Sequence, residues 1–337
     1  MKLLHNILGQ RRAARLAPSV PRVARIALSA RPIHGPWGGA NQWLLQMMRF
    51  LKFSGYDVCF DLSDDVDCAL ILPSRLQGRM TFGLSELREH RRRNPRFRVI
   101  HRVNNNDIRK GGSGVDDFLA TFDEVTDHTV FVSAWLRDYH AGRWFDPARP
   151  HSAILNGADP SVFHPIGSRP WKSGEPFRIV THHWADNPMK GFAEYAALDA
   201  LIAEGTLPGF ELWIIGRWPA DIVWKKARTF PPCSGPTLAD LLRQCHGYIT
   251  ASRWEPGAMH HIEGAQCGLP LVYHEDSGGS VEVGQRFGVP FRDGLTSAVL
   301  RLREEYTTLR RRVFDAMPSG SLMCMEYLRL IQRLLAE

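Results

Sequence analysis

The residues whose type and spacing most suggest chemistry are Glu255 and Glu263. They lie eight positions apart in the stretch SRWEPGAMHHIEGAQCGLPLV, residues 252–272, which ends in an apolar segment typical of a buried strand. A carboxylate accepts two hydroxyl hydrogen bonds at once, which suits sugar recognition. We therefore expect Glu255 to contact a sugar and Glu263 to reach a ribose diol. The alternative is that both are acidic residues on a solvated helix.

The segment between the two glutamates predicts a phosphate site. Pro256 and Gly257 suit the first turn of a helix that begins directly after a strand. Free backbone amides at such a start, here near Gly257 and Ala258, favour a phosphate or diphosphate together with the helix dipole. We therefore expect a helix from residue 256 whose first turn faces a bound anion.

A lysine and three glycines follow strands elsewhere in the chain. Lys190 and Gly191 begin a predicted helix in THHWADNPMKGF. The lysine can neutralise a diphosphate leaving group as charge develops on it, or it is an ordinary surface lysine. The loop HGPWGGANQ offers Gly38 and Gly39 for close backbone approach to a ligand. It lacks the GxGxxG pattern, so it supports a dinucleotide-binding fold only weakly.

A polar loop, RVNNNDIRKGGSG at residues 102–114, follows the predicted strand FRVIHRVN. Its side chains could read acceptor hydroxyls or bind an anionic acceptor, or the loop could simply be solvated. The candidate acceptor-side residues are Asn104, Asp107, Arg109 and Lys110.

The elements that must position these residues alternate between apolar strands and amphipathic helices. Such alternation predicts an α/β protein with parallel sheets covered on both faces. It runs through residues 22–157, stops at a linker rich in proline and glycine at 158–176, and resumes over 177–318. We expect two doubly wound, Rossmann-like domains that face each other across a cleft.

The stretch RWEPGAMHHIEGAQCGLPLV resembles the Glu–seven residues–Glu signature of family 4 of the retaining glycosyltransferases. VFVSAWL, NGADPSVFHP, the Lys190–Gly191 pair and SGGSVEVG add to the resemblance, which covers roughly residues 22–290. It implies the GT-B fold and transfer of a hexosyl unit from a nucleoside diphosphate sugar to a glycan or lipid-linked acceptor. It also implies retention of configuration, with no metal and no cofactor.

The resemblance assigns roles to individual residues. It implies that Glu255 contacts the donor sugar, that Glu263 holds the ribose and that Lys190 binds the diphosphate. It also implies an active-site histidine at His101 and a C-terminal helix, residues 319–337, that packs back on the first domain.

One position departs from the family pattern. An arginine usually precedes the diphosphate lysine and shares the diphosphate with it, but THHWADNPMK contains none. Either His183 or a cation from elsewhere replaces the arginine, or donor binding is weaker. Arg217, after the predicted strand ELWIIG, is a candidate because it should also lie at a strand's carboxyl end.

Composition bounds the remaining possibilities. The net charge is +7, and residues 1–21 are basic without any acidic residue, so they could form an interfacial anchor, a transit peptide or a frayed tail. Arginines at residues 88–98 extend this charge. We therefore expect a cytoplasmic enzyme that binds an anionic membrane surface peripherally, or else a basic solubilising face. No apolar run is long enough to span a membrane.

Other classes of site are less well supported. The six cysteines show no CxxC pair and suggest reduced core thiols rather than zinc ligands. Asp65 and Asp67 have D-x-D spacing but lie in a predicted turn, so we interpret them as structural. HRRRNPRFR, residues 90–98, resembles no nucleic-acid module. The alternative functions are a non-catalytic protein that binds an anionic partner through a degenerate cleft, and a sugar-nucleotide epimerase.

Overall fold

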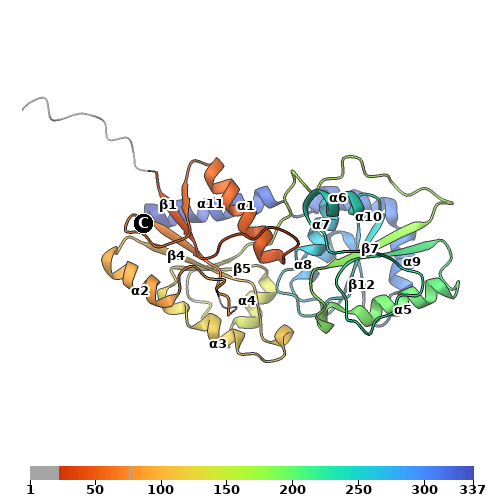
Figure 1. The fold of residues 1–337 in the computed structure, drawn as a ribbon, viewed down its shortest axis with the longest axis horizontal. Helices are drawn as coiled ribbons and strands as arrows, with labels where there is room; N and C mark the ends of the chain where they lie inside the picture. Colours follow the sequence, from red (N-terminus) through yellow and green to blue (C-terminus); the bar gives the residue numbers. More distant parts are fainter. Residues whose placement is uncertain (1–22, 76–77) are drawn as a thin grey trace, which may run out of the picture.

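The first of two α/β domains is built on a six-stranded parallel sheet (Figure 1). The computed structural model describes residues 23–75 and 78–337, without the side chain of Lys110. The strands run in the order β2-β1-β3-β4-β5-β6. They are β1 (Arg25–Leu28), β2 (Asp57–Cys59), β3 (Cys68–Ile71), β4 (Arg98–Val103), β5 (His128–Phe131) and β6 (His151–Ala153). The helical segments are α1 (Gly39–Phe53), α2 (Leu84–Arg93), η1 (Ile108–Lys110), α3 (Val115–Ala120), η2 (Asp123–Val125) and α4 (Ala134–His140).

The second domain repeats this plan with strand order β12-β11-β10-β7-β8-β9, again all parallel. Its strands are β7 (Phe177–His183), β8 (Phe210–Gly216), β9 (Arg228–Phe230), β10 (Gly247–Thr250), β11 (Leu271–His274) and β12 (Gly288–Phe291). Its helical segments are η3 (Pro188–Lys190), α5 (Phe192–Ala203), α6 (Gly235–Leu242), α7 (His260–Gln266), α8 (Ser280–Phe287), α9 (Thr296–Glu304) and α10 (Tyr306–Ala316). Central strands such as β3, β5, β10 and β11 are buried throughout because helices cover both faces.

Each sheet reverses its strand order at one point, and ligands of open α/β sheets bind at the carboxyl ends of the strands beside such a switch point. In the first sheet, β1 lies between β2 and β3, so the switch point is between β1 and β3. In the second sheet it lies between β7 and β10. The loops after these four strands therefore form the expected binding region.

The C-terminal helix α11 (Gly320–Ala336) leaves the second domain and packs beside α1 of the first (Figure 1). Its buried face joins the first core: Tyr327 meets Trp43 edge to face, with ring centroids 5.2 Å apart, and Ile331 is fully buried. The crossing is the one that the family resemblance implied. It ties the two domains together outside the cleft.

Several local expectations were wrong. The helix expected from residue 256 begins only at His260, so the segment before it is an irregular loop. Helices α9 and α10 follow each other directly and are separated at Glu305, with no glycine or proline to mark the break. The short strands β9 and β12 were not predicted. Residues 1–21 lie outside the described residues.

No helix in the described part of the chain is long and apolar enough to cross a membrane. All six cysteines are free thiols, and five of them are buried.

We predict that Ile331→Ala destabilises the protein by about 2–5 kcal/mol, because it leaves a cavity where α11 meets the first core. The measurement is the urea unfolding midpoint. Leu322→Ala on the same helix is the matched control, since this side chain is 60% exposed and its truncation leaves no cavity. Equal midpoints for the two variants would show that α11 does not stabilise the first domain.

Candidate functional site

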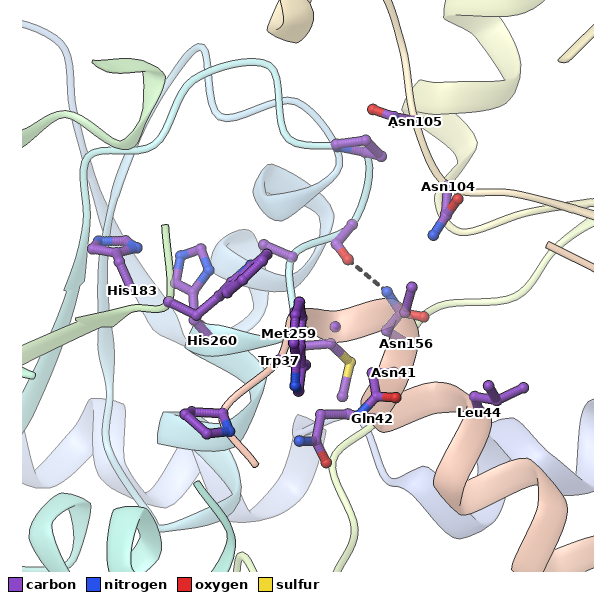
Figure 2. Close-up of a pocket in the computed structure, with 18 of the residues that line it drawn as sticks. Trp37, Asn41, Gln42, Leu44, Asn104, Asn105, Asn156, His183, Met259 and His260 are labelled. Atoms are coloured by element: carbon purple, nitrogen blue, oxygen red, sulfur yellow. Dashed lines mark hydrogen bonds between the residues drawn. The ribbon is translucent and has the colours of Figure 1, made fainter. Parts of the chain in front are cut away.

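A cavity of about 670 Å³ lies where the loops of the two domains meet. Most of the predicted site residues line it: Glu255, Lys190, Glu263, Gly257, Ala258, Gly38, Gly39, His183, Asn104 and Arg109. Figure 2 shows His183 and His260 at one side, Asn104 and Asn105 at the other, and Asn41, Gln42 and Leu44 at the start of α1. The cavity is therefore built from both domains.

Glu255 is the centre of the site. It lies in the loop after β10 and is only 1% exposed. Its Oε1 accepts a hydrogen bond from Lys190 Nζ at 2.6 Å, and its Oε2 lies 2.9 Å from Arg109 Nη1. Burial alone would raise the pKa of Glu255, but the charges of Arg109 and Lys190 outweigh it and lower the pKa below its ordinary value. Glu255 is therefore an ionised carboxylate held between two cations.

These two cations come from different domains. Lys190 ends η3 after β7, at the switch point of the second sheet, whereas Arg109 belongs to η1 of the first domain. The sequence placed Arg109 on the acceptor side, but the structure joins it to Glu255. The Nε of Arg109 is buried and has no hydrogen-bond partner among the described residues. Arg109 thus keeps a donor for a further group in the cavity.

The loop that carries Glu255 is bonded to the first domain along its length. Three side chains of the first domain donate hydrogen bonds to its carbonyls: Asn106 Nδ2 to Trp254 (3.0 Å), Ser133 Oγ to Pro256 (2.5 Å) and Asn156 Nδ2 to Gly257 (2.5 Å; Figure 2). A Cβ on Gly257 would lie 2.8 Å from the carbonyl oxygen of Val132, so this close approach needs glycine. The loop is held by these interdomain contacts and by backbone hydrogen bonds to the segment after β11, and not by a helix.

Glu263 lies on α7 and is 6% exposed. Its Oε2 is 2.8 Å from Nε2 of His182, the residue before His183 at the end of β7. The other ring nitrogen of His182 lies 3.0 Å from the hydroxyl of Tyr248. This chain of contacts orients the carboxylate. Sequence reasoning missed His182 as a site residue, although its place at the carboxyl end of β7 was a usable signal.

Neither of the two residues suggested as substitutes for the missing arginine brings a positive charge to the cavity wall. His183 is 4% exposed, and its Nε2 lies 3.0 Å from Thr181 Oγ1. Burial, and then the nearby charge of Lys190, lower the pKa of His183 well below its ordinary value, so the ring is neutral. Arg217 is exposed, does not line the cavity and donates to the carbonyl of Trp184 at 2.7 Å. Arg109 is better placed than either.

Three other predicted residues, His101, Asp107 and Gly191, are not among the residues that line the cavity. His101 is fully buried in β4, packed against Trp144 and Phe122. Asp107 accepts hydrogen bonds from the backbone of Val115 and thereby shapes its own loop. Gly191 has φ +75°, and a Cβ there would lie 2.4 Å from that of Ala251, so its role is close packing beside Lys190. The side chain of Lys110 lies outside the described residues.

The D-x-D pair and the arginines of α2, which the sequence analysis did not assign to a site, have partners within the first domain. Asp67 accepts from the backbone N–H of Arg25, and Asp65 accepts from its guanidinium, both at 2.8 Å. The arginines of α2 mostly face acidic residues: the ion pairs are Arg88–Glu124, Arg91–Asp127, Arg92–Glu89 and Arg93–Asp64. The basic stretch is therefore less positive than its sequence suggested.

The buried histidines predict that the free energy of unfolding depends on pH. Burial lowers the pKa of His101 to about 3 and the pKa of His261 to about 4. In the unfolded chain these histidines have pKa values near 6.5, so as the pH falls they are protonated in the unfolded state before the folded state. Their contribution to the free energy of unfolding is therefore fully present above about pH 6.5 and is lost as the pH falls toward the folded-state pKa values. We predict that the free energy of unfolding falls by about 1.4 kcal/mol less in His101→Leu than in the unaltered protein when the pH is lowered from 6 to 5, because the variant lacks one buried histidine.

The measurement is the free energy of unfolding in urea at pH 7, 6 and 5, with the exposed His34→Leu as control. The same variant also tests the role of His101, because a residue outside the cavity can be replaced without loss of ligand binding. A well-folded His101→Leu protein that no longer binds its ligand would restore the catalytic assignment made from the sequence.

No family model and no curated protein matches the sequence. Solved structures match the fold. One is sucrose-phosphate synthase from Thermosynechococcus elongatus (16% identity, TM-score 0.64), and another is a glycosyltransferase from Rickettsia africae (13% identity, TM-score 0.65). Each match covers 93% of this chain and 99% of the other chain. The match to HepE from Anabaena, solved with UDP-glucose, covers 92% of this chain and 99% of HepE, with 11% identity and a TM-score of 0.64. The expected fold is confirmed: this chain has the GT-B fold of glycosyltransferases.

Proposed function

We propose that this protein is a glycosyltransferase that moves a hexosyl unit from a nucleoside diphosphate sugar to an acceptor, with retention of configuration. The observation that carries the proposal is the cluster of Lys190, Glu255 and Arg109 in the cavity between the domains. It combines a sugar-binding carboxylate with two cations suited to a diphosphate. The resemblance of the paired glutamates to family 4, the GT-B fold and the complex of HepE with UDP-glucose support the same function.

The donor nucleotide belongs on the second-domain wall. Glu263, oriented by His182, receives the ribose hydroxyls, and Lys190 receives the diphosphate. Arg109 takes the part of the absent family arginine, because it already meets Glu255 and retains an unpartnered Nε–H. The nucleotide diphosphate then replaces part of the contact that Glu255 now makes with these cations. Glu255 is freed to accept hydroxyl groups of the transferred sugar.

The residues of the cavity favour a mechanism in which the diphosphate leaves and the acceptor attacks on the same face of the sugar. Its carboxylates, among the described residues, are Glu255 and Glu263. The first is clamped by two cations and the second by His182, so neither suits the role of a nucleophile in a double displacement. As the glycosidic C–O bond breaks, the leaving diphosphate gains negative charge, which Lys190 and Arg109 stabilise. The acceptor oxygen attacks from the same side and its proton passes to the departing phosphate.

Metal-independent transfer follows from the same cations. Lys190 and Arg109 supply the positive charge that a divalent ion supplies at other diphosphates. The D-x-D pair, Asp65 and Asp67, lies outside the cavity wall and is bound to Arg25. Membrane attachment through α2 is not part of the proposal, because its arginines mostly pair with acidic residues of the same domain.

We predict that Lys190→Ala and Arg109→Gln each weaken binding of a nucleoside diphosphate about ten- to a hundredfold, the loss expected for one charge-assisted contact. The measurement is calorimetry with UDP, GDP and ADP. Arg217→Gln, an exposed arginine that does not line the cavity, is the control and should bind like the unaltered protein. If Arg109→Gln also bound normally, Arg109 would not be the diphosphate arginine.

We predict that Glu255→Gln reduces turnover far more than nucleotide affinity, because the amide keeps the shape but loses the charge that orients the sugar. The assay follows product by NMR, which also reports its anomeric configuration, with and without a metal chelator. A product of inverted configuration would contradict the retaining mechanism. Conversion of the donor without any acceptor would favour an epimerase, and absence of both reactions would favour a non-catalytic binding protein.

A further inference from the structure

The first-domain wall of the cavity carries a surplus of positive charge. Four arginines of this domain line the cavity in addition to Arg109, and no carboxylate of the described first-domain residues does; they are Arg31, Arg75, Arg79 and Arg102. None of the four forms an ion pair with a carboxylate in the described parts of the chain. This contrasts with the arginines of α2, which are mostly paired. The positive charge of the wall is therefore left for something that enters the cavity.

Arg102 shows the surplus most clearly. Its side chain projects from β4, is 1% exposed and lies over the ring of Trp43, with its Cζ 4.6 Å from the ring centroid. Its Nη2 donates to Asn156 Oδ1 at 2.8 Å, whereas Nε and Nη1 have no partner among the described residues. Burial lowers the pKa of Arg102. A buried cation without a carboxylate is costly, and it raises the positive potential of the wall above it.

The other three arginines surround the switch point of the first sheet. Arg31 follows β1, and Arg75 and Arg79 follow β3, the two strands between which the strand order reverses. Carboxyl ends of strands at such a point are where α/β sheets bind ligands. The guanidinium of Arg31 packs over Phe60 at 4.9 Å and that of Arg79 over Trp37 at 5.3 Å. Stacking on a ring fixes the plane of a guanidinium and leaves its in-plane N–H groups for an anion.

The charge on this wall is separate from the charge assigned to the donor. The donor diphosphate is matched by Lys190 and Arg109, which meet at Glu255. Arg31, Arg75 and Arg79 belong to other loops of the first domain than the segment that carries Arg109, and a neutral sugar would leave their charges uncompensated. Asn104 and Asn105 on the same wall supply neutral donors and acceptors suited to hydroxyl groups.

We propose that the acceptor is anionic: a sugar that bears a phosphate or carboxylate group, which Arg31, Arg75 and Arg79 bind above the buried charge of Arg102. Guanidinium groups bind both kinds of anion in a bidentate manner. The inference rests on the proposed function, since it names the substrate class for the second half of the same cavity. It places two anions in one site, the donor diphosphate and the acceptor anion, on opposite walls.

The binding test uses inorganic phosphate as the probe for the second anion site. The protein is first saturated with the nucleoside diphosphate that binds best, and phosphate is then titrated while its 31P NMR line broadening is followed. We expect saturable binding that weakens as KCl is added. The double variant Arg31→Gln/Arg79→Gln should weaken it about tenfold or more, without a change in nucleoside diphosphate affinity. Arg93→Gln on α2, which pairs with Asp64 outside the cavity, is the control.

The transfer test separates the two sources of the anion. Sugar phosphates, uronic acids and the corresponding neutral sugars are offered with the donor, and product mass is recorded for the unaltered protein and the double variant. Product from sugar phosphates alone identifies a phosphate acceptor, and product from uronic acids alone identifies a carboxylate acceptor. Phosphate that does not bind, or neutral sugars that react as well as anionic ones in both proteins, would overturn the inference. A protein that binds no nucleoside diphosphate would instead refute the proposed function.

Discussion

The placement of one carboxylate organises the site. Glu255 is buried and ionised, and an ionised carboxylate taken out of water is tolerated only where charge and hydrogen bonds compensate it. Lys190 provides that compensation from the same domain and Arg109 from the other. The contact therefore does two things at once. It holds the carboxylate of Glu255 in its charged form, and it makes the electrostatics of the site depend on how the domains are arranged.

The surrounding backbone is shaped to permit this arrangement. The loop after β10 accepts hydrogen bonds from three side chains of the first domain, and it approaches Val132 so closely that only glycine fits at position 257. The glycine loop before α1 meets the second domain in the same way: a Cβ on Gly38 would lie 2.7 Å from Trp184, and one on Gly39 would lie 2.5 Å from Met259. These glycines serve contact between domains. Any separation of the domains has to break these polar contacts and remove Arg109 from Glu255 at the same time.

The sequence predicted much of the fold and about half of the chemistry of the site, for a physical reason. Alternating apolar strands and amphipathic helices are local patterns, so both sheets could be inferred from them. Glu255, Glu263 and Lys190 were expected near a sheet edge because they follow strands, and all three line the cavity. The contact of Arg109 with Glu255 joins residues 146 positions apart, and no local pattern encodes it. The helix expected at residue 256 was wrong because interdomain hydrogen bonds, and not helical ones, satisfy the carbonyls of that loop.

The distribution of paired and unpaired charges suits the cavity to the two substrates of the proposed reaction. On the second-domain wall each carboxylate already has a partner within the protein, Glu255 with Lys190 and Glu263 with His182, so the site is electrostatically balanced before a ligand arrives. On the first-domain wall Arg109 pairs with Glu255, whereas Arg31, Arg75, Arg79 and Arg102 form no ion pair with a carboxylate in the described chain. In the proposed reaction, a dianionic donor that draws Lys190 and Arg109 away from Glu255 leaves that carboxylate beside the transferred sugar. Its negative charge then lies where positive charge develops on the sugar ring as the glycosidic bond breaks, and the opposite wall keeps its cations for the acceptor.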